Sequence, residues 1–233
     1  MLFVAIVGAF LAFTLSASAG LGGSLILVPV LILTLGTKEG IALSAFLLAA
    51  NNVMKVFAYR ETIPLRAVLL VICMTILGAA FGSKLLLSAP EGWIDVAVIV
   101  SIGLTLTAEK ARWHVFQGVS APLLALFSGI TSGFSGSSGP LKGVALRNLA
   151  LERQYMVGAA SMVSLAGDLT KSLVFWQSNI LDHQQLLFLL SITPLMPAAT
   201  LLGRHINRRL GEQAYATLFW GVMVGYSIRI LAV

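Results

Sequence analysis

Long apolar stretches are the feature of this sequence that most restricts its fold. A helix needs about 20 apolar residues to cross the hydrocarbon core of a bilayer, because each residue advances it by about 1.5 Å. Several stretches meet this requirement, namely residues 41–59, 67–87, 155–176, 186–203 and 214–231. Two somewhat shorter stretches of the same kind cover residues 93–107 and 116–130. Together they predict an all-α polytopic membrane protein.

The composition agrees with a membrane protein. Of the 233 residues, 58% are apolar and only 10% are charged, whereas soluble domains have about 25% charged residues. A transmembrane β-barrel is disfavoured, since its alternating strands would leave about half of each segment polar. One cysteine is too few for a disulfide scaffold or a cysteine-bound metal centre. The net charge of +6 comes from basic residues that lie mostly in short loops, so we expect it to reflect membrane orientation rather than nucleic-acid binding.

Two apolar segments are too short to cross a membrane as ordinary helices. They cover residues 25–35 and 144–151, and each follows a loop rich in small residues, at 16–24 and 131–143. Short, interrupted segments at matching positions in two halves of a chain are typical of the binding site of a transporter.

The two halves match at the level of single residues. An offset of 116 places Gly136 on Gly20 and Lys171 on Lys55. The matched lysines are informative because lysine is rare in this chain and both lie inside apolar segments. The match predicts an internal duplication within one membrane domain. Its predicted parts are a first repeat at 1–107, a cytoplasmic linker at 108–115 and a second repeat at 116–233.

Each repeat is expected to contain a Gly/Ser-rich hairpin, formed by short or re-entrant helices, and three spanning helices, with about 8–10 membrane segments in all. A hairpin returns the chain to its starting side and three crossings follow, so the second repeat should be inverted relative to the first. Counting crossings puts nine basic loop residues on one side and four on the other, which obeys the positive-inside rule. Both termini are then extracytoplasmic. The alternative is a parallel repeat in which each hairpin counts as one broken helix.

The N-terminal apolar run, residues 2–15, is followed by Ser16-Ala17-Ser18-Ala19 and has features of a signal peptide. It lacks a basic start, however, and the repeat supplies it with a counterpart in the second half. We therefore expect this run to belong to the mature membrane domain.

Lys55 and Lys171 are candidate binding residues. Placing an ammonium group inside a bilayer costs about 2.5–3.5 kcal/mol, so an ionisable residue there suggests a function. The alternative is that each side chain extends to the headgroups. Asn52 and Asp168 lie three positions before these lysines and share their helix faces, and Asn51 adjoins Asn52. Asn52 could offer its amide to a ligand, and Asp168 could pair with Lys171 or carry a proton.

The two small-residue loops are the second part of the predicted site. Glycine lets backbone N–H groups turn toward a ligand, and the N-terminus of the helix that follows is favourable for an anion. Serine hydroxyls add further donors. The alternative for each glycine is close helix packing. The loop residues predicted to bind substrate are Gly20, Gly22, Gly23, Ser24, Ser135, Gly136, Ser137, Ser138 and Gly139.

These loops carry a resemblance to a known family. Residues 20–31, which run Gly20-Leu21-Gly22-Gly23-Ser24 and continue to Pro29, resemble the first glycine-rich motif of the sulfite exporter TauE/SafE family, also described as a 4-toluene sulfonate uptake permease family. Residues 132–141 resemble the second copy. The second copy has Ser137 and Ser138 where glycines are usual. The resemblance covers nearly the whole chain and implies transport of sulfite, sulfonates or related sulfur-containing anions.

We therefore expect a secondary transporter in the bacterial inner membrane that moves a small oxyanion. An anion channel, or less plausibly a membrane-embedded enzyme, is the alternative. No nucleophile elbow, paired carboxylates or Walker motif indicates catalysis, and we expect no cofactor and no metal. The predicted partners are the anionic substrate, the lipid bilayer and a coupling proton or ion.

Overall fold

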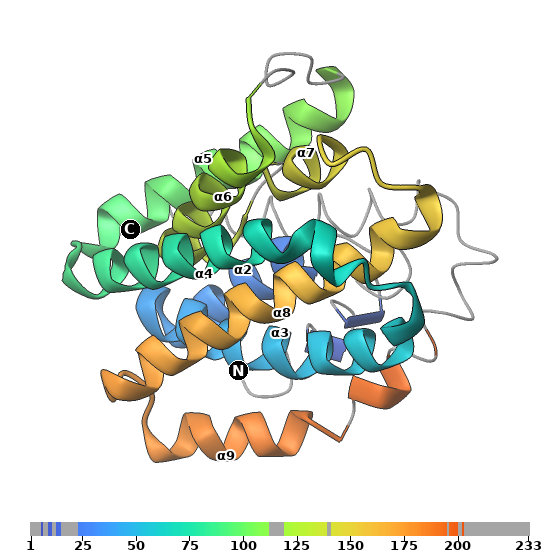
Figure 1. The fold of residues 1–233 in the computed structure, drawn as a ribbon. Helices are drawn as coiled ribbons and strands as arrows, with labels where there is room; N and C mark the ends of the chain where they lie inside the picture. The colour runs from blue at the N-terminus through green and yellow to red at the C-terminus, as the bar shows by residue number, and fades with distance from the viewer. Residues whose placement is uncertain are drawn as a thin grey trace. The chain divides into compact units, whose positions relative to one another are not determined.

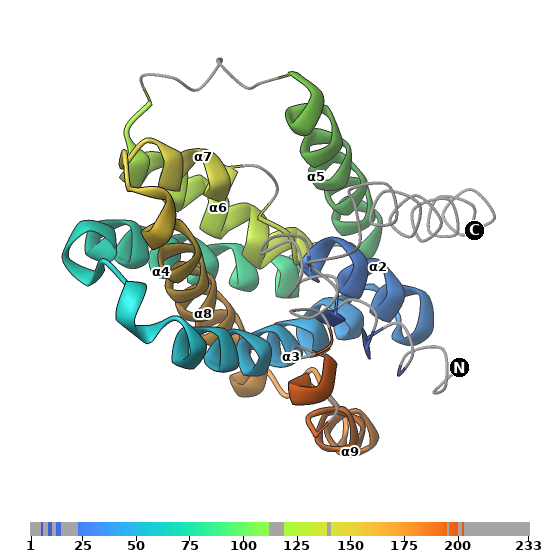
Figure 2. The ribbon, with the colours of Figure 1, turned by 90° about the vertical axis from the view of Figure 1, so that its right-hand side faces the viewer.

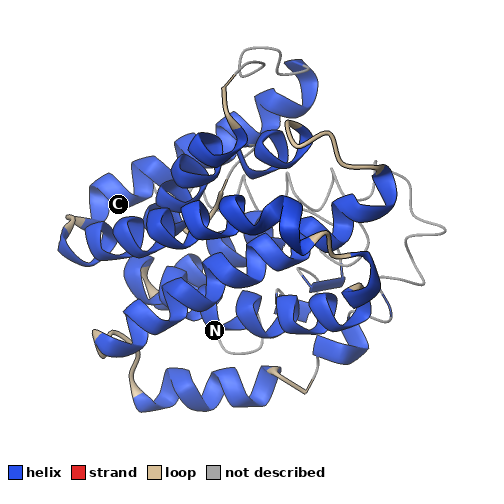
Figure 3. Ribbon diagram, in the orientation of Figure 1, coloured by secondary structure: helices blue, strands red, loops and turns tan. Residues whose placement is uncertain are grey.

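The regular structure of the described residues is entirely helical (Figure 3). The computed structural model describes residues 23–111, 119–138, 141–194 and 196–199, together with 6, 9–10, 13–14 and 202. The elements, coloured along the chain in Figure 1, are α2 (Gly23–Leu35), α3 (Thr37–Ala58), η1 (Arg60–Thr62), α4 (Leu65–Ser88), α5 (Glu91–Ala111), α6 (Ala121–Ser135), α7 (Leu141–Arg147), α8 (Arg153–Gln177) and α9 (His183–Ile192).

Each apolar stretch that falls within the described ranges is helical. Thr37–Phe57 and Leu65–Ser88 are long and apolar enough to cross a membrane, and Gly23–Leu35 and Ala121–Ser135 are shorter apolar helices. The predicted span 186–203 is interrupted in its described part: α9 ends at Ile192 and a turn at Thr193 and Pro194 follows. The predicted span 214–231 lies outside the described residues.

Two predicted boundaries in the second half are wrong. The short segment predicted at 144–151 is displaced, because α7 runs from Leu141 to Arg147 and a turn follows. The loop expected at 131–143 begins later, because α6 continues to Ser135. Gly136 then ends the helix with a φ of 73°, a left-handed conformation that glycine adopts without the steric cost of a side chain.

The described parts of the chain form two compact units. One comprises residues 1–51 and 180–233, and the other comprises residues 52–179. These units differ from the predicted repeats of 1–107 and 116–233; the repeats remain a prediction, since a repeat need not form a compact unit by itself. The second unit contains the end of α3, η1 and α4 to α8, and it holds the lysines and Asp168 discussed below.

Within the second unit, α4 packs against α6 and α8 (Figures 1 and 2). Glycines bring α4 and α6 into backbone contact. A Cβ on Gly129 of α6 would lie 2.5 Å from the carbonyl oxygen of Thr75. A Cβ on Gly133, one turn later, would lie 2.6 Å from the carbonyl oxygen of Ala79, also one turn later. Because both positions advance together, α4 and α6 run parallel.

The same comparison gives the direction of α8. A Cβ on Gly158 would contact the backbone of Thr62, just before α4 begins, and one on Gly167 would lie 3.1 Å from the Cγ2 atom of Thr75. α8 therefore runs parallel to α4. In addition, α3 begins at Thr37 and α8 at Arg153, which are 116 positions apart, the same offset that aligns the two lysines.

Candidate functional site

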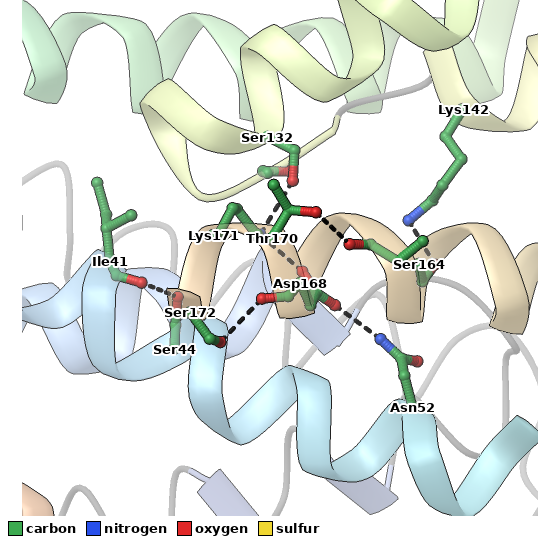
Figure 4. Close-up of polar contacts among 12 residues, drawn as sticks. Ile41, Ser44, Asn52, Ser132, Lys142, Ser164, Asp168, Thr170, Lys171 and Ser172 are labelled. Carbon is green, nitrogen blue, oxygen red and sulfur yellow. Dashed lines mark hydrogen bonds and ion pairs between the residues drawn. The ribbon is translucent and has the colours of Figure 1, made fainter. Parts of the chain in front are cut away.

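The centre of the polar region is an ion pair on α8. The Nζ atom of Lys171 lies 2.7 Å from the Oδ1 atom of Asp168, three residues earlier on the same helix face (Figure 4). The Lys171 side chain is 1% exposed and that of Asp168 is 10% exposed. The predicted pairing of these two residues is therefore present.

Lys171 also contacts α6. Its Nζ atom donates a hydrogen bond to the Oγ atom of Ser132 at 3.0 Å. The ammonium group thus points into the protein between two helices. Lys171 does not extend to the headgroups, which was the alternative that the sequence left open.

Asn52 binds the second oxygen of the Asp168 carboxylate. Its Nδ2 atom donates a hydrogen bond to the Oδ2 atom of Asp168 at 2.7 Å (Figure 4). The amide that was expected to face a ligand is therefore bound to Asp168, because a buried carboxylate oxygen is a stronger acceptor than a neutral group. Asn52 and Asp168 are 116 residues apart, so the residues that contact each other occupy equivalent positions of the predicted repeats.

Lys142 is not among the residues that the sequence predicts to bind substrate. The sequence allows two interpretations of it, a charge that draws anions to the outer mouth of the site or an ordinary solvated charge beside the loop. The structure instead puts it on α7, with its Nζ atom donating a hydrogen bond to the Oγ atom of Ser164 on α8 at 2.8 Å. Pro140 could have revealed this, since proline is favourable in the first turn of a helix and so marks an earlier helix start.

Lys55 on α3 belongs to the same electrostatic environment. It is partly buried, and it interacts with the charges of Lys142 and Asp168. Lys142 interacts in turn with Asp168 and Lys171. We call Lys55, Lys142, Lys171 and Asp168 the lysine cluster. With all four groups ionised, three ammonium groups face one carboxylate, so the cluster has an excess of positive charge that an anion can balance.

The loop residues of the predicted site have mixed positions. Ser135 lies in α6, and its Oγ atom donates to the carbonyl oxygens of Thr131 at 2.9 Å and Ser137 at 3.3 Å. Ser137 and Ser138 are buried after the end of α6. Gly136 forms the helix end described above. Ser135 and Gly136 thus have local roles in shaping the turn.

The first-repeat candidates are only partly described. Gly23 and Ser24 lie in α2, and Asn51 is buried on α3. Gly20, Gly22 and Gly139 lie outside the described residues. No group of three or more His, Cys, Asp and Glu side chains suited to a metal ion occurs among the residues that the structure describes.

The sequence of the whole chain decides the family. The model of the family described as Sulfite exporter TauE/SafE matches residues 4–230 of the 233. The chain belongs to the sulfite exporter TauE/SafE family. TauE/SafE proteins are membrane transporters, and the apolar helices α3 and α4 agree with that class. Comparisons with curated proteins and with solved structures gave no significant match.

For a TauE/SafE transporter, a buried charge cluster is the part of the molecule that requires a functional explanation. Ionisable groups in membrane helices are costly, and they often mark the path of a substrate or ion. Within the lysine cluster, Lys55 lies on α3, one of the two described helices long and apolar enough to cross a membrane. Hydrogen bonds join α8 to three other helices: Asn52 connects α3, Lys142 connects α7 and Ser132 connects α6.

Proposed function

We propose that this protein is a secondary transporter that moves small sulfur-containing oxyanions, such as sulfite or a sulfonate, across the bacterial inner membrane. The observation that carries this proposal is the lysine cluster, in which three lysines share the single carboxylate of Asp168. Membership of the sulfite exporter family supports the choice of a sulfur-containing anion. An oxyanion fits the cluster because each ammonium group offers donors only and each oxyanion oxygen is an acceptor.

The members of the cluster have different roles in this proposal. Lys171 is held by Asp168 and Ser132, so it fixes the position of the site. Lys55 and Lys142 interact with the charge of Asp168, which already forms the ion pair with Lys171. Lys55 and Lys142 therefore provide the attraction for the substrate. Asp168 limits the positive charge, which allows the anion to leave again.

Two inverted repeats would supply the movement. α3 and α4 are successive crossings joined by η1 and so run in opposite directions. α8, the counterpart of α3, runs parallel to α4, which supports an α8 that is inverted relative to α3. A parallel repeat of four spans would give the opposite direction. Rocking of one repeat element against the other around a central site would then give alternating access.

The same topology gives the proposed orientation in the membrane. Arg60, Arg66, Arg147 and Arg153 lie on the cytoplasmic side, and both termini are extracytoplasmic. The positive-inside rule supports this assignment. A cysteine added after Val233 in a Cys73→Ala background tests it, because Cys73 is an exposed thiol of the chain itself. We expect a membrane-impermeant thiol reagent to label the added cysteine in whole cells. Labelling only after permeabilisation would contradict the assignment.

Sulfite flux into proteoliposomes tests the function. We expect the wild-type protein to move sulfite down its gradient and Lys55→Met to reduce the rate at least about tenfold, since loss of an ionic hydrogen bond costs about 1.5–3 kcal/mol. Lys84→Met is a matched control, because Lys84 is exposed near the end of α4. Normal flux through Lys55→Met would remove Lys55 from the site. Single-channel currents in a planar bilayer would contradict a transporter and indicate a channel.

Lys142→Met provides an independent test of the lysine that the structure places on α7 against Ser164. The substitution removes an ammonium group whose hydrogen-bond partner is the neutral hydroxyl of Ser164. No charged partner is left uncompensated there, so folding should remain nearly intact. We expect the KM for sulfite to rise about tenfold or more, because a donor to an anionic ligand is lost. An unchanged KM, measured alongside wild-type protein in the same proteoliposomes, would show that Lys142 has no contact with the substrate.

A further inference from the structure

Most of the buried or partly buried serine and threonine hydroxyls on these helices donate a hydrogen bond to a backbone carbonyl of their own helix. Thr170 donates to the carbonyl oxygen of Ala166 at 2.8 Å, and Ser161 donates to that of Val157 at 2.8 Å. Such bonding to the preceding turn is the usual way to bury serine or threonine in an apolar helix. It leaves no donor available for a ligand.

Thr75 on α4 and Ser128 on α6 differ from this pattern. Thr75 is 5% exposed as a whole residue and Ser128 is 1% exposed. The hydroxyl oxygens of both are inaccessible to solvent, and neither has a hydrogen-bond partner among the described residues. A buried polar group without a partner costs about 1–3 kcal/mol, so its presence at two adjoining positions requires a reason.

Both hydroxyl-bearing residues lie beside the lysine cluster. The Cγ2 atom of Thr75 is 3.1 Å from the point where a Cβ on Gly167 would lie, and Gly167 immediately precedes Asp168. Ser128 is one helical turn before Ser132, which binds Lys171. Ser128 is also next to Gly129, whose Cβ position is 2.5 Å from the carbonyl oxygen of Thr75. α4 and α6 therefore bring the two residues to the same level of the unit.

The charges near Thr75 and Ser128 indicate whether their hydroxyls would bind a cation or an anion. Hydroxyl oxygens could in principle coordinate a cation or donate to an anion. Lys171 lies on the neighbouring turn, and Lys142 and Lys55 interact with the same carboxylate. The Asp168 carboxylate is already engaged by Lys171 and Asn52. Three ammonium groups repel a cation and attract an anion.

We propose that Thr75 and Ser128 form an uncharged hydrogen-bonding wall of the anion site and donate their hydroxyl protons to oxygen atoms of the bound oxyanion. This inference rests on the proposed transport of an oxyanion and adds two binding residues to it. Hydroxyl donors are directional, whereas the attraction of an ammonium group depends mainly on charge. The wall therefore favours ligands with several acceptor oxygens, such as sulfite, over a spherical halide.

The experiment compares hydroxyl-deleting variants with matched controls. Thr75→Val and Ser128→Ala remove the two donors, and Thr170→Val and Ser161→Ala remove hydroxyls that bond within their own helix. Thr75→Ser keeps the hydroxyl and serves as the rescue variant. Calorimetry of purified protein measures the Kd for sulfite and for chloride, proteoliposome flux measures KM, and thermal unfolding in detergent measures Tm.

We expect Thr75→Val and Ser128→Ala each to raise the Kd and KM for sulfite about tenfold, since the lost hydrogen bond involves a charged ligand. The Kd for chloride should change little, and the Tm without ligand should stay the same or rise, because a buried hydroxyl without a partner is removed. The controls and Thr75→Ser should retain wild-type affinity. Where Ser128→Ala reduces folding, Ser128→Cys, which keeps a side chain of similar size with a weak donor, should show the same rise in Kd.

Two outcomes would overturn the inference. Unchanged affinity for sulfite in both variants would show that the hydroxyls do not contact the anion. A lowered Tm with unchanged affinity would show that they have a structural role, such as holding a buried water. In either case, wild-type sulfite flux that depends on Lys55 would leave the proposed function standing. Absence of sulfite flux in the wild-type protein would instead overturn the proposed function and the inference with it.

Discussion

Replacing Lys171 by methionine is expected to destabilise the protein by about 3–5 kcal/mol and to abolish sulfite transport. This is the cost of removing one partner from a buried ion pair and leaving the other charge uncompensated. Lys171 is almost fully buried, and its ammonium group contacts Asp168 at 2.7 Å and Ser132 at 3.0 Å. After the substitution, the Asn52 amide still binds the carboxylate, but a single neutral donor does not replace an ammonium group.

The effect on stability and the effect on transport can be separated by a second substitution. In the double variant Asp168→Asn, Lys171→Met, both charges are absent and the Asn52 amide still finds an oxygen acceptor at position 168. We expect thermal unfolding in detergent to recover most of the lost stability. Transport should remain absent, because the site still lacks the positive charge of Lys171. Recovery of sulfite flux in the double variant would mean that Lys171 only compensates Asp168 and takes no part in binding the substrate.

Replacing Gly82 by leucine is expected to prevent α4 and α6 from packing and thus to prevent the protein from folding. A Cβ on Gly82 would contact the carbonyl oxygen of Ile130, and one on Gly78 would contact that of Leu126. Gly129 and Gly133 approach α4 in the same way. These atoms belong to the backbone and cannot rotate away, so the helices would have to separate. Glycines spaced four apart allow such close contact between membrane helices.

A milder substitution makes this prediction quantitative. Gly82→Ala should destabilise by about 1–3 kcal/mol or more, which is the usual cost of overpacking. Gly103→Ala is the matched control, because no atom lies within 4 Å of its Cβ position on α5. Alanine has the higher helix propensity, so the control should unfold at the same or a slightly higher temperature. Similar Tm values for Gly82→Ala and Gly103→Ala in fluorescence-monitored unfolding would contradict the close packing of α4 and α6.

The helices could be predicted because their signal is local. Apolar stretches of spanning length are visible in the residues themselves, and the described helices agree with them within a few positions at most ends. The interruption after Ile192 also has a local cause, since Pro194 interrupts helical hydrogen bonding. The end of α6 was missed because Thr131, Ser132, Gly133 and Ser135 read as a loop. Packing of Gly133 against α4 stabilises the helix there.

The candidate site was predictable where one helix carries two residues of a pair. Asp168 and Lys171 are three positions apart, so helical geometry alone puts them on one face. Spacing along one helix could not identify Ser132, Lys142 or Thr75. Each belongs to another helix and reaches α8 only through packing between α4, α6, α7 and α8.

The sequence alone determined that this protein is helical, lies in a membrane and carries two matched lysines, because hydropathy and spacing act along the chain. Its full-length match determined the TauE/SafE family. The tertiary structure alone decided that Asn52 binds Asp168 and that Lys142 bonds to Ser164 on α8. The physical reason is that a contact between helices depends on their register and separation. Both are set by backbone contacts at a few glycines, such as Gly82 and Gly133, between segments distant in sequence.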